Sequence, residues 1–531
     1  MSSAEPPVEL APWRPRYNPW LIAVVVALGG FMEVLDTSIA NVALPYMAGD
    51  LGSSNDESTW VLTSYLVSNA IVLPISGWLA GALGRKRFFM ICLFLFTLSS
   101  LLCGLAPSLG LLLLCRVLQG AGGGGLQPMA QAILADTFPP QKRGLAFALY
   151  GITAVTAPTI GPTLGGWITF NYSWRWIFFI NIPVGIVTLL FVARLLEDPP
   201  YLAHAKRGGV KLDYVGIAFL TLGVGALQVL LDKGQEDDWF GSPFITTLVV
   251  VSAVCLVALV VWEWFHKAPI VDVRLFRSFN FATANLMMFV LGILLFAGLV
   301  MMPQFLQTLV GYTSQIAGLA ISPGGLALLL LMPIVGQLTA KLQARHLIAF
   351  GWLALAVGMY YSTKRIDLQI SFSAALWLRV IQVIGLGFLF VPITLVVYVG
   401  IPPEKNNAAS GLLNFMRNMG SSVGTSLVTT LIARRSQLHQ ARLVEHVRPD
   451  NPTFQNILGA LTRQLSRSGL AVHEAQTRAY ASLYRALQAQ AATLAYIDTF
   501  KVLAVGSAFM IGLAFLLKRN EPGGGGEVAA G

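Results

Sequence analysis

The sequence predicts an all-α membrane protein that crosses a bilayer many times. Of its 531 residues, 55% are hydrophobic and only 11% are charged, whereas soluble domains usually carry about 25% charged residues. Apolar runs long enough to span a bilayer recur along the whole chain. Basic loops alternate with neutral or acidic loops between these runs. Together the three observations predict a polytopic bundle of transmembrane helices.

Fourteen runs are long and apolar enough to form a spanning helix. The first run is longer than a signal-peptide core and follows a polar, proline-rich tail, so we expect it to stay in the mature protein. An even number of spans places both ends of the chain on one side of the membrane. The runs are 19–45, 58–80, 87–106, 109–135, 145–170, 174–196, 214–232, 243–265, 281–307, 316–340, 346–363, 372–400, 406–433 and 496–517.

The net charge of +10 is distributed as membrane topology requires. Loops on one side carry the basic residues, and the loops between them are neutral or acidic, as at 50–57 and 236–238. An excess of Lys and Arg marks cytoplasmic loops, so both termini are expected in the cytoplasm and no nucleic-acid partner is expected. Lys364 and Arg365 are an exception to the pattern. The basic segments are 85–87, 142–143, 206–211, 267–277, 341–345, 405 and 518–519.

The two ends of the chain repeat one another. PPQK at 139–142 returns as PPEK at 402–405, and at the same offset Arg116 and Gln119 correspond to Arg379 and Gln382. LPISGWL, which contains Gly77, likewise corresponds to MPIVGQL at 332–338. A nearly constant offset across three regions predicts two related six-helix halves. Parallel halves of this kind are a transporter architecture, with the substrate site between them near the midplane.

The repeat divides the chain into five parts. The first six spans match the last six, and the seventh and eighth have no counterpart, which makes them an inserted pair. The polar segment 436–495 is the one long stretch outside the membrane and has an amphipathic helical pattern. The expected parts are a cytoplasmic tail 1–17, a first half 18–200, an insert 201–278, a second half 279–518 that contains 436–495, and a disordered tail 519–531.

Few charges lie inside the predicted spans, and each costs about 2.5–3.5 kcal/mol on the insertion scale, so such residues usually serve function. In the first half, Glu33 and Asp36 share one helix face, and Arg116 and Gln119 share another. These are candidates for proton coupling and for the substrate cavity. In the alternative interpretation, Asp36 and Arg116 form a structural ion pair, and Glu33 lies on a packing face. The candidates of the second half are Arg379, Gln382, Asn414, Arg417 and Asn418.

A pair of carboxyl groups with an arginine can couple a proton to transport. Burial and a nearby cation act on the proton affinity of a carboxyl in opposite directions. Two close acids also titrate as one unit. If the cavity opens to each side in turn, a proton can be taken up outside and released inside. No bound cofactor and no metal are needed.

The fifth span carries two prolines and several glycines in the sequence GITAVTAPTIGPTLGGWI. Proline removes a backbone donor and bends a helix, and small residues allow close helix packing. The segment is thus either a functional bend or only a tightly packed helix. The residues concerned are Pro158, Gly161, Pro162, Gly165 and Gly166.

A glycine run in the fourth span, at 120–125, fits the dinucleotide pattern G-x-G-x-x-G. That site requires a strand before the glycines in a soluble βαβ unit, whereas this run lies inside an apolar span. We therefore expect the glycines to permit close helix packing instead.

Taken together, these motifs resemble the major facilitator superfamily, in its fourteen-helix drug–proton antiporter branch, and within it the EmrB-type multidrug exporters. The resemblance rests on LDTSIANVALP (35–45), GWLAGALGRKR (77–87), RVLQGAGGGG (116–125), GPTLGG (161–166) and WRWIFFINIPVG (174–185). It implies that Asp36 takes part in protonation, that Arg116 takes part in proton transfer, and that the glycine–proline bend is associated with export.

The resemblance also carries implications for gating and partners. The loop motif contains Gly77, Gly84, Arg85 and Arg87, but Gly81 stands where the family usually has an acid, which weakens the expected gating charge relay. In that case Arg85 and Arg87 could serve topology alone. The resemblance further implies a bacterial inner-membrane location, a periplasmic adaptor protein and an outer-membrane channel, with 436–495 as the segment that touches the adaptor.

The leading functional hypothesis is a proton-driven antiporter that exports hydrophobic or amphipathic small molecules. An alternative is a dedicated efflux carrier for one compound, such as a siderophore, a natural product or a fatty acid. A membrane enzyme is disfavoured because the six histidines do not cluster and no phosphate-binding loop with Lys-Ser/Thr appears. A receptor or scaffold is disfavoured because it would not need a repeat with matching buried arginines.

Overall fold

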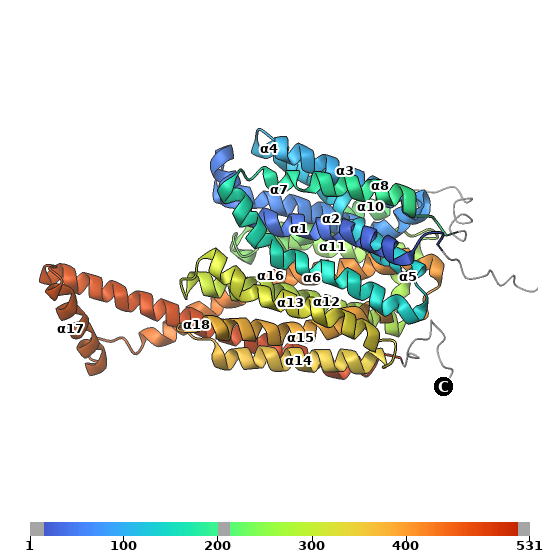
Figure 1. Cartoon of the computed structure of the whole chain (residues 1–531). Coiled ribbons are helices and arrows are strands. Elements are labelled where there is room, and N and C mark those ends of the chain that lie inside the picture. Colours follow the sequence, from blue (N-terminus) through green and yellow to red (C-terminus); the bar gives the residue numbers. More distant parts are fainter. Residues whose placement is uncertain (1–14, 200–212, 519–531) are drawn as a thin grey trace, which may run out of the picture.

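The computed structural model describes residues 15–199 and 213–518, and within them it is a bundle of long helices with a projecting arm (Figure 1). No strand occurs in these two ranges. Most of the expected tail 1–17, the basic segment 206–211 and the expected disordered tail 519–531 lie outside the described residues.

The first half contains six predicted spans, two of which are interrupted. The fourth span is α4 followed by α5, and the sixth is α7 followed by α8. The elements are α1 (Pro19–Leu51), α2 (Asn55–Leu83), α3 (Arg85–Leu105), α4 (Leu109–Gly123), α5 (Leu126–Thr137), α6 (Pro140–Asn171), α7 (Trp176–Phe179) and α8 (Asn181–Leu195).

The inserted pair and the second half follow in the predicted order. The pair is α10 (Tyr214–Lys233) and α11 (Pro243–Phe265), joined through the short turn η1 (Trp239–Gly241). The remaining elements are η2 (Val273–Arg277), α12 (Phe279–Thr308), α13 (Ser314–Leu338), α14 (Ala344–Arg365), α15 (Phe372–Val397), η3 (Pro403–Lys405), α16 (Asn406–Val444), α17 (Pro452–Arg467) and α18 (Val472–Ala514).

Each of the fourteen predicted spans falls on a helical segment, but two of these helices are less apolar than expected. Within the described ranges, 12 spans are long and apolar enough to cross a membrane when α4–α5 and α7–α8 each count as one. The other two predicted spans are α14 and α16. Lys364 and Arg365 lie near the end of α14, and α16 carries a stripe of polar side chains that faces the first half.

The packing repeats between the halves as the sequence repeat predicts. In the first half α1 packs on α6, α3 on α4, and α3 on α8. In the second half the corresponding helices form the same pairs: α12 on α16, α14 on α15, and α14 on α18. The inserted pair α10–α11 lies to one side, where α10 contacts both α2 and α16.

The halves meet mainly along two helix pairs, α2 with α16 and α6 with α13, with smaller contacts of α5 with α16 and of α6 with α15. Glycine makes both crossings close. A Cβ atom on Gly77 would lie 2.6 Å from the Cα of Ala408, and one on Gly336 would lie 2.8 Å from the carbonyl oxygen of Gly144. Backbone therefore packs directly on backbone at these two points, which explains why the loop motif begins with glycine.

The segment 436–495, which was expected outside the membrane, forms a helical arm that projects from one end of the bundle (Figure 1). It consists of the end of α16, all of α17 and the first part of α18. α18 has 43 residues, which at 1.5 Å per residue is about 65 Å, roughly twice the thickness of a hydrocarbon core. α1 begins and α18 ends at the opposite end of the bundle.

The glycine run ends α4 and separates it from α5. Gly122 packs against the backbone of Phe96 in α3, and Gly124 packs against the backbone oxygen of Asn69 in α2. A Cβ atom at either position would lie within 2.8 Å of these backbone atoms. The glycines thus serve close helix packing, as predicted.

Candidate functional site

Asp36 and Arg116 form an ion pair inside the first half. Asp36 on α1 and Arg116 on α4 are 2% and 0% exposed, and Arg116 Nη1 lies 2.5 Å from Asp36 Oδ2. Arg116 Nε also donates to the carbonyl oxygen of Val61 at 3.1 Å. These contacts join α1, α2 and α4 in a water-excluded interior.

Two amides complete the environment of Asp36. Gln119 Nε2 and Asn181 Nδ2 donate to Asp36 Oδ1 at 2.9 and 2.7 Å. Gln119 Oε1 in turn accepts a 2.8 Å hydrogen bond from Arg116 Nη1. Asp36, Arg116 and Gln119, which the sequence singled out, therefore lie together as one cluster. Asn181, from the start of α8, was missed, although it lies inside the WRWIFFINIPVG motif.

Glu33 lies one helical turn from Asp36 and faces a different set of partners. It is 5% exposed and accepts hydrogen bonds from Asn69 Nδ2 at 3.0 Å and from Gln127 Nε2. Its direct hydrogen-bond partners are all neutral side chains. Tyr65 lies between the two acids: its hydroxyl is 3.5 Å from Glu33 Oε1, and its ring centroid is 4.3 Å from Arg116 Cζ.

The partners of Glu33 connect it to the second half. Gln127 Oε1 accepts from Arg417 Nη2 of α16 and, at 3.0 Å, from the hydroxyl of Tyr150. Asn418 Nδ2 donates to Asn69 Oδ1 at 3.0 Å. One turn away, Asn414 Nδ2 donates to Gln131 Oε1 at 2.8 Å. The predicted polar stripe of α16 thus lies along the seam between the halves.

Arg379 and Gln382 do not join these clusters. They lie on α15 and are 4% and 0% exposed. Gln382 Nε2 donates to Ser362 Oγ at 2.8 Å. No ion pair of Arg379 occurs in the described ranges. The candidate residues of the two halves therefore lie in three places: the Asp36 cluster, the Glu33 seam and Arg379.

The glycine–proline segment of α6 is a continuous helix that packs closely on α1. Gly161 lies against Ser38, and Gly165 lies against Ile39. Pro162 has no N–H for the carbonyl of Pro158, and the hydroxyl of Ser38 donates to that carbonyl at 3.3 Å. A side chain of α1 thus replaces a missing backbone hydrogen bond of α6. The neighbouring Gly166 makes no comparably close contact, since a Cβ there would be 3.9 Å from Val42.

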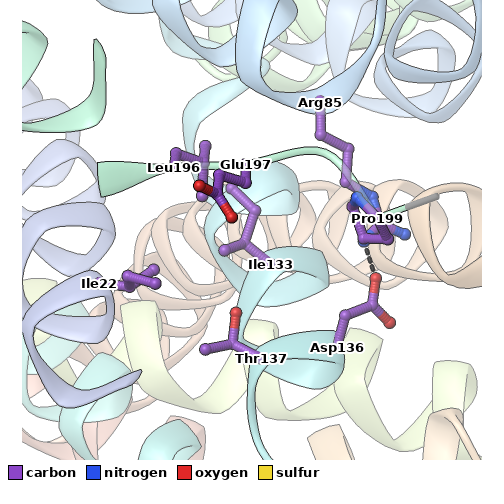
Figure 2. Close-up of a pocket in the computed structure, with 8 residues that line it drawn as sticks. All are labelled: Ile22, Arg85, Ile133, Asp136, Thr137, Leu196, Glu197 and Pro199. Atoms are coloured by element: carbon purple, nitrogen blue, oxygen red, sulfur yellow. Dashed lines mark ion pairs between the residues drawn. The ribbon is translucent and has the colours of Figure 1, made fainter. Parts of the chain in front are cut away.

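A second polar cluster joins the halves at the end of the bundle opposite the arm. Arg85, 2% exposed, pairs with Asp136 at the end of α5 (Figure 2). Arg85 Nε also donates to Asn407 Oδ1 at 2.5 Å, and Asn406 Nδ2 donates to Asp136 Oδ1 at 2.8 Å. Both asparagines begin α16. Arg85 and Asp136 therefore link the first half to the second.

This cluster changes the interpretation of the loop motif. The sequence lacks an acid at Gly81, and a Cβ there would meet nothing within 4 Å. Asp136, more than 50 residues further on, supplies a carboxylate to Arg85 instead. Arg85 is thus an inter-half contact, whereas Arg87 is exposed. Asp136 was not among the predicted residues, although an acid at the end of an otherwise apolar span was a visible signal.

The chemistry that these sites can support is acid–base chemistry. No group of three or more His, Cys, Asp or Glu side chains in the described ranges could hold a metal ion. Two buried carboxyl groups, one paired with an arginine and one bonded to amides, lie close enough to communicate through Tyr65. Amides and Arg417 then extend the network to the second half.

Comparisons with known proteins agree with this architecture. Residues 26–425 match the Major Facilitator Superfamily. The chain is 38% identical over 506 residues to the multidrug export protein EmrB of Escherichia coli K12, covering 95% of this chain and 96% of that protein. It is 39% identical to EmrB of Haemophilus influenzae over 94% and 96% of the two chains. It is 40% identical to the fatty acid resistance protein FarB of Neisseria gonorrhoeae over 83% and 86%.

Solved structures show the same fold at low sequence identity. The proton:xylose symporter XylE superposes with a TM-score of 0.61 at 14% identity, over 95% of this chain and 97% of that chain. The human organic anion transporter MFSD10 superposes with a TM-score of 0.58 at 13% identity, over 94% and 100%. With its two repeated halves, its buried ion pair and its near full-length similarity to EmrB proteins, this chain belongs to the Major Facilitator Superfamily of membrane transporters.

Proposed function

We propose that the protein is a proton-driven antiporter that exports hydrophobic or amphipathic small molecules by alternating access. The observation that carries the proposal is the placement of two buried acids on one face of α1, with Arg116 and Tyr65 between them. The near full-length similarity to proteins named multidrug export protein supports the substrate class.

The two acids and Arg116 act as one unit in this proposal. A buried cation without a counter-charge is costly, so Arg116 keeps a carboxylate partner throughout the cycle. While Arg116 pairs with Asp36, Glu33 holds the proton. When Arg116 moves along the ring of Tyr65 to Glu33, Glu33 releases its proton inside the cell and Asp36 takes up a proton from outside. When Arg116 returns to Asp36, that proton passes to Glu33. At each moment one acid is ionised and paired and the other is neutral.

The charge of Glu33 then controls the seam. An ionised Glu33 attracts Arg417 through Gln127, whereas a protonated Glu33 donates a hydrogen bond instead of only accepting them. Asn69 can accept that hydrogen bond if its amide and that of Asn418 both turn by half a rotation, which preserves their contact. Proton movement within the first half thus changes the hydrogen bonds to the second half.

The sidedness and partners follow from the arm and the charge pattern. We place the protein in a bacterial inner membrane with both termini cytoplasmic, because the basic loops lie at the end from which α1 begins. The arm then lies in the periplasm, where it contacts an adaptor protein that leads to an outer-membrane channel. Its exposed apolar side chains, Ile457, Val472, Tyr480 and Tyr484, are suited to such a contact.

A dedicated carrier for one compound remains the second candidate. The similarity to FarB, which is named for fatty acid resistance, favours a fatty acid among such compounds. A narrow substrate range would separate this candidate from multidrug export.

The proposed function is tested in proteoliposomes that hold a pH gradient. Addition of a transported compound from a panel of cationic, neutral and anionic amphiphiles should dissipate the gradient, because export exchanges the compound for protons. The readout is the fluorescence of an entrapped pH dye, with protein-free liposomes as the control. A gradient that no compound in the panel affects would show that the protein is not a proton antiporter for these classes.

The shared-arginine mechanism predicts non-additive stability. Asp36→Asn and Glu33→Gln should each fold, because Arg116 can pair with the remaining acid, and each should lose uphill transport. The double variant leaves Arg116 buried without a partner, which costs about 3–5 kcal/mol. Its unfolding temperature should therefore fall by much more than the sum of the single changes.

Thermal unfolding of the four proteins in detergent checks this cycle, and Glu445→Gln, at an exposed acid of the arm, is the matched control. Additive effects of the two substitutions would contradict a shared arginine. Retained uphill transport in Asp36→Asn would remove Asp36 from proton coupling and leave the ion pair a purely structural role.

The arm is predicted to serve partner binding and not the transport step. Replacing residues 445–487 by a short glycine–serine linker should weaken association with the adaptor encoded by the same organism, measured by co-purification, while transport in liposomes stays near the wild-type rate. The reverse result, normal association with lost liposome transport, would make the arm part of the transport core.

A further inference from the structure

Arg379 differs from the other buried cations of the chain. Four cations are buried in the described ranges: Arg85, Arg116, Lys233 and Arg379. The first three pair with Asp136, Asp36 and Glu236. Arg379 has no ion pair and donates no hydrogen bond within those ranges, although it is only 4% exposed.

An unpaired buried guanidinium is a costly feature for a protein to keep. Removing a charge from water without a counter-charge costs several kcal/mol. Arg379 has five N–H donors and no acceptor capacity of its own. A buried arginine without a partner therefore indicates a site where a bound anion would pair with the guanidinium.

The internal repeat indicates which anion fits. In the first half, the first helix, α1, supplies Asp36 to Arg116. In the second half, the corresponding helix, α12, presents Gly298 to Arg379: a Cβ atom on Gly298 would lie 2.9 Å from Arg379 Nη1. The second half thus has the arginine and the glutamine of the first half, and no carboxylate from the first helix beside them.

Gln382 is incomplete in the same way. Gln119 Oε1 accepts a hydrogen bond from Arg116, whereas Gln382 Oε1 is buried and has no hydrogen-bond partner. Both Arg379 Nη1 and Gln382 Oε1 lie near Gly298, at 2.9 and 3.9 Å from the position of its added Cβ. Both atoms therefore face the point where a carboxylate is missing. A carboxylate bound there would pair with Arg379, and Gln382 Oε1 could then accept from the oriented guanidinium, as Gln119 Oε1 accepts from Arg116.

The site lies one helix away from the seam between the halves. On α13, Gly324 packs against Arg379, and the next residue, Gly325, packs against Thr159 of α6 in the first half. A small molecule that enters between α6 and α13 would pass this position. Glycine at 298 and 324 leaves the guanidinium covered by backbone alone on two sides.

From this we infer that Arg379 is the specificity-determining residue that receives the carboxylate of an amphipathic substrate, in the place that Asp36 holds beside Arg116. The inference rests on the proposed export function and names one substrate class for it. Arginine suits this role because its planar fork binds a carboxylate through two parallel hydrogen bonds. A neutral isostere of the same shape would leave the guanidinium unpaired.

The test compares carboxylates with their neutral isosteres on the purified full-length protein. Benzoate, 2-naphthoate and dodecanoate are each paired with the corresponding primary amide, and binding is measured by calorimetry at a pH where the acids are ionised. Wild-type protein should bind at least one carboxylate about tenfold or more tightly than its amide, since a charge-assisted hydrogen bond gives about that ratio.

Three variants assign the preference to the site. Arg379→Gln should abolish the preference for the carboxylate and leave binding of the amide unchanged, and Arg434→Gln, at an exposed arginine, should change neither. Gly298→Asp places a resident carboxylate beside Arg379 and should exclude the external one while amide binding persists.

Arg379→Gln should also leave the unfolding temperature equal or higher, whereas Arg116→Gln should lower it, because only Arg116 loses an ion pair.

Two outcomes would overturn the inference. One is wild-type protein that binds no carboxylate more tightly than its amide. The other is a carboxylate preference that survives in both Arg379→Gln and Gly298→Asp. Neither outcome affects the export proposal, because gradient dissipation by neutral or cationic compounds is measured separately in proteoliposomes.

Discussion

The buried ion pair between Asp36 and Arg116 is the interaction on which the first half depends. It joins α1 to α4, its guanidinium holds the carbonyl of Val61 in α2, and Asn181 ties the same carboxylate to α8. A single charge pair therefore determines how four helices of the half are positioned relative to one another.

The second half has a different electrostatic character despite its related fold. Its arginine at the repeated position has no acid beside it, and its polar stripe on α16 faces the first half and not its own core. In the proposed mechanism the halves divide the work: the first carries the protons, and the second supplies neutral amides, Arg417 and Arg379. The two halves pack alike but carry different charged residues. A proton-coupled exchanger needs such a difference, because the proton and the exported compound require different sites.

Much of the fold could be predicted from periodicity and charge. The spans, the inserted pair and the helical character of 436–495 follow from apolar runs, the sequence offset and composition. The pairing of Asp36 with Arg116 could also be predicted from the sequence, because opposite charges that are buried in a membrane protein usually pair with one another. The separate partners of Glu33 and Asp36 could not be predicted. A spacing of three residues shows that the two acids share a helix face, but it does not show which neighbouring helices that face contacts.

Contacts between distant segments were the part that the sequence could not supply. Asp136 takes the place of an acid missing at Gly81, and Ser38 satisfies a carbonyl freed by Pro162. Both depend on helix crossings that no local pattern encodes. The isolation of Arg379 is a similar case, since an absent partner becomes visible only when every neighbouring helix is in place.

The central claim is that Glu33 and Asp36 share one proton and one arginine. Infrared spectroscopy of the carboxyl C=O stretch at neutral pH tests this claim directly, because it counts protonated buried acids. In difference spectra between the wild-type protein and each variant, the account predicts that the same single band is lost in Glu33→Gln and in Asp36→Asn, since the remaining acid is then ionised and paired with Arg116. Persistence of that band in either single variant would show that the acids titrate independently and would contradict the account.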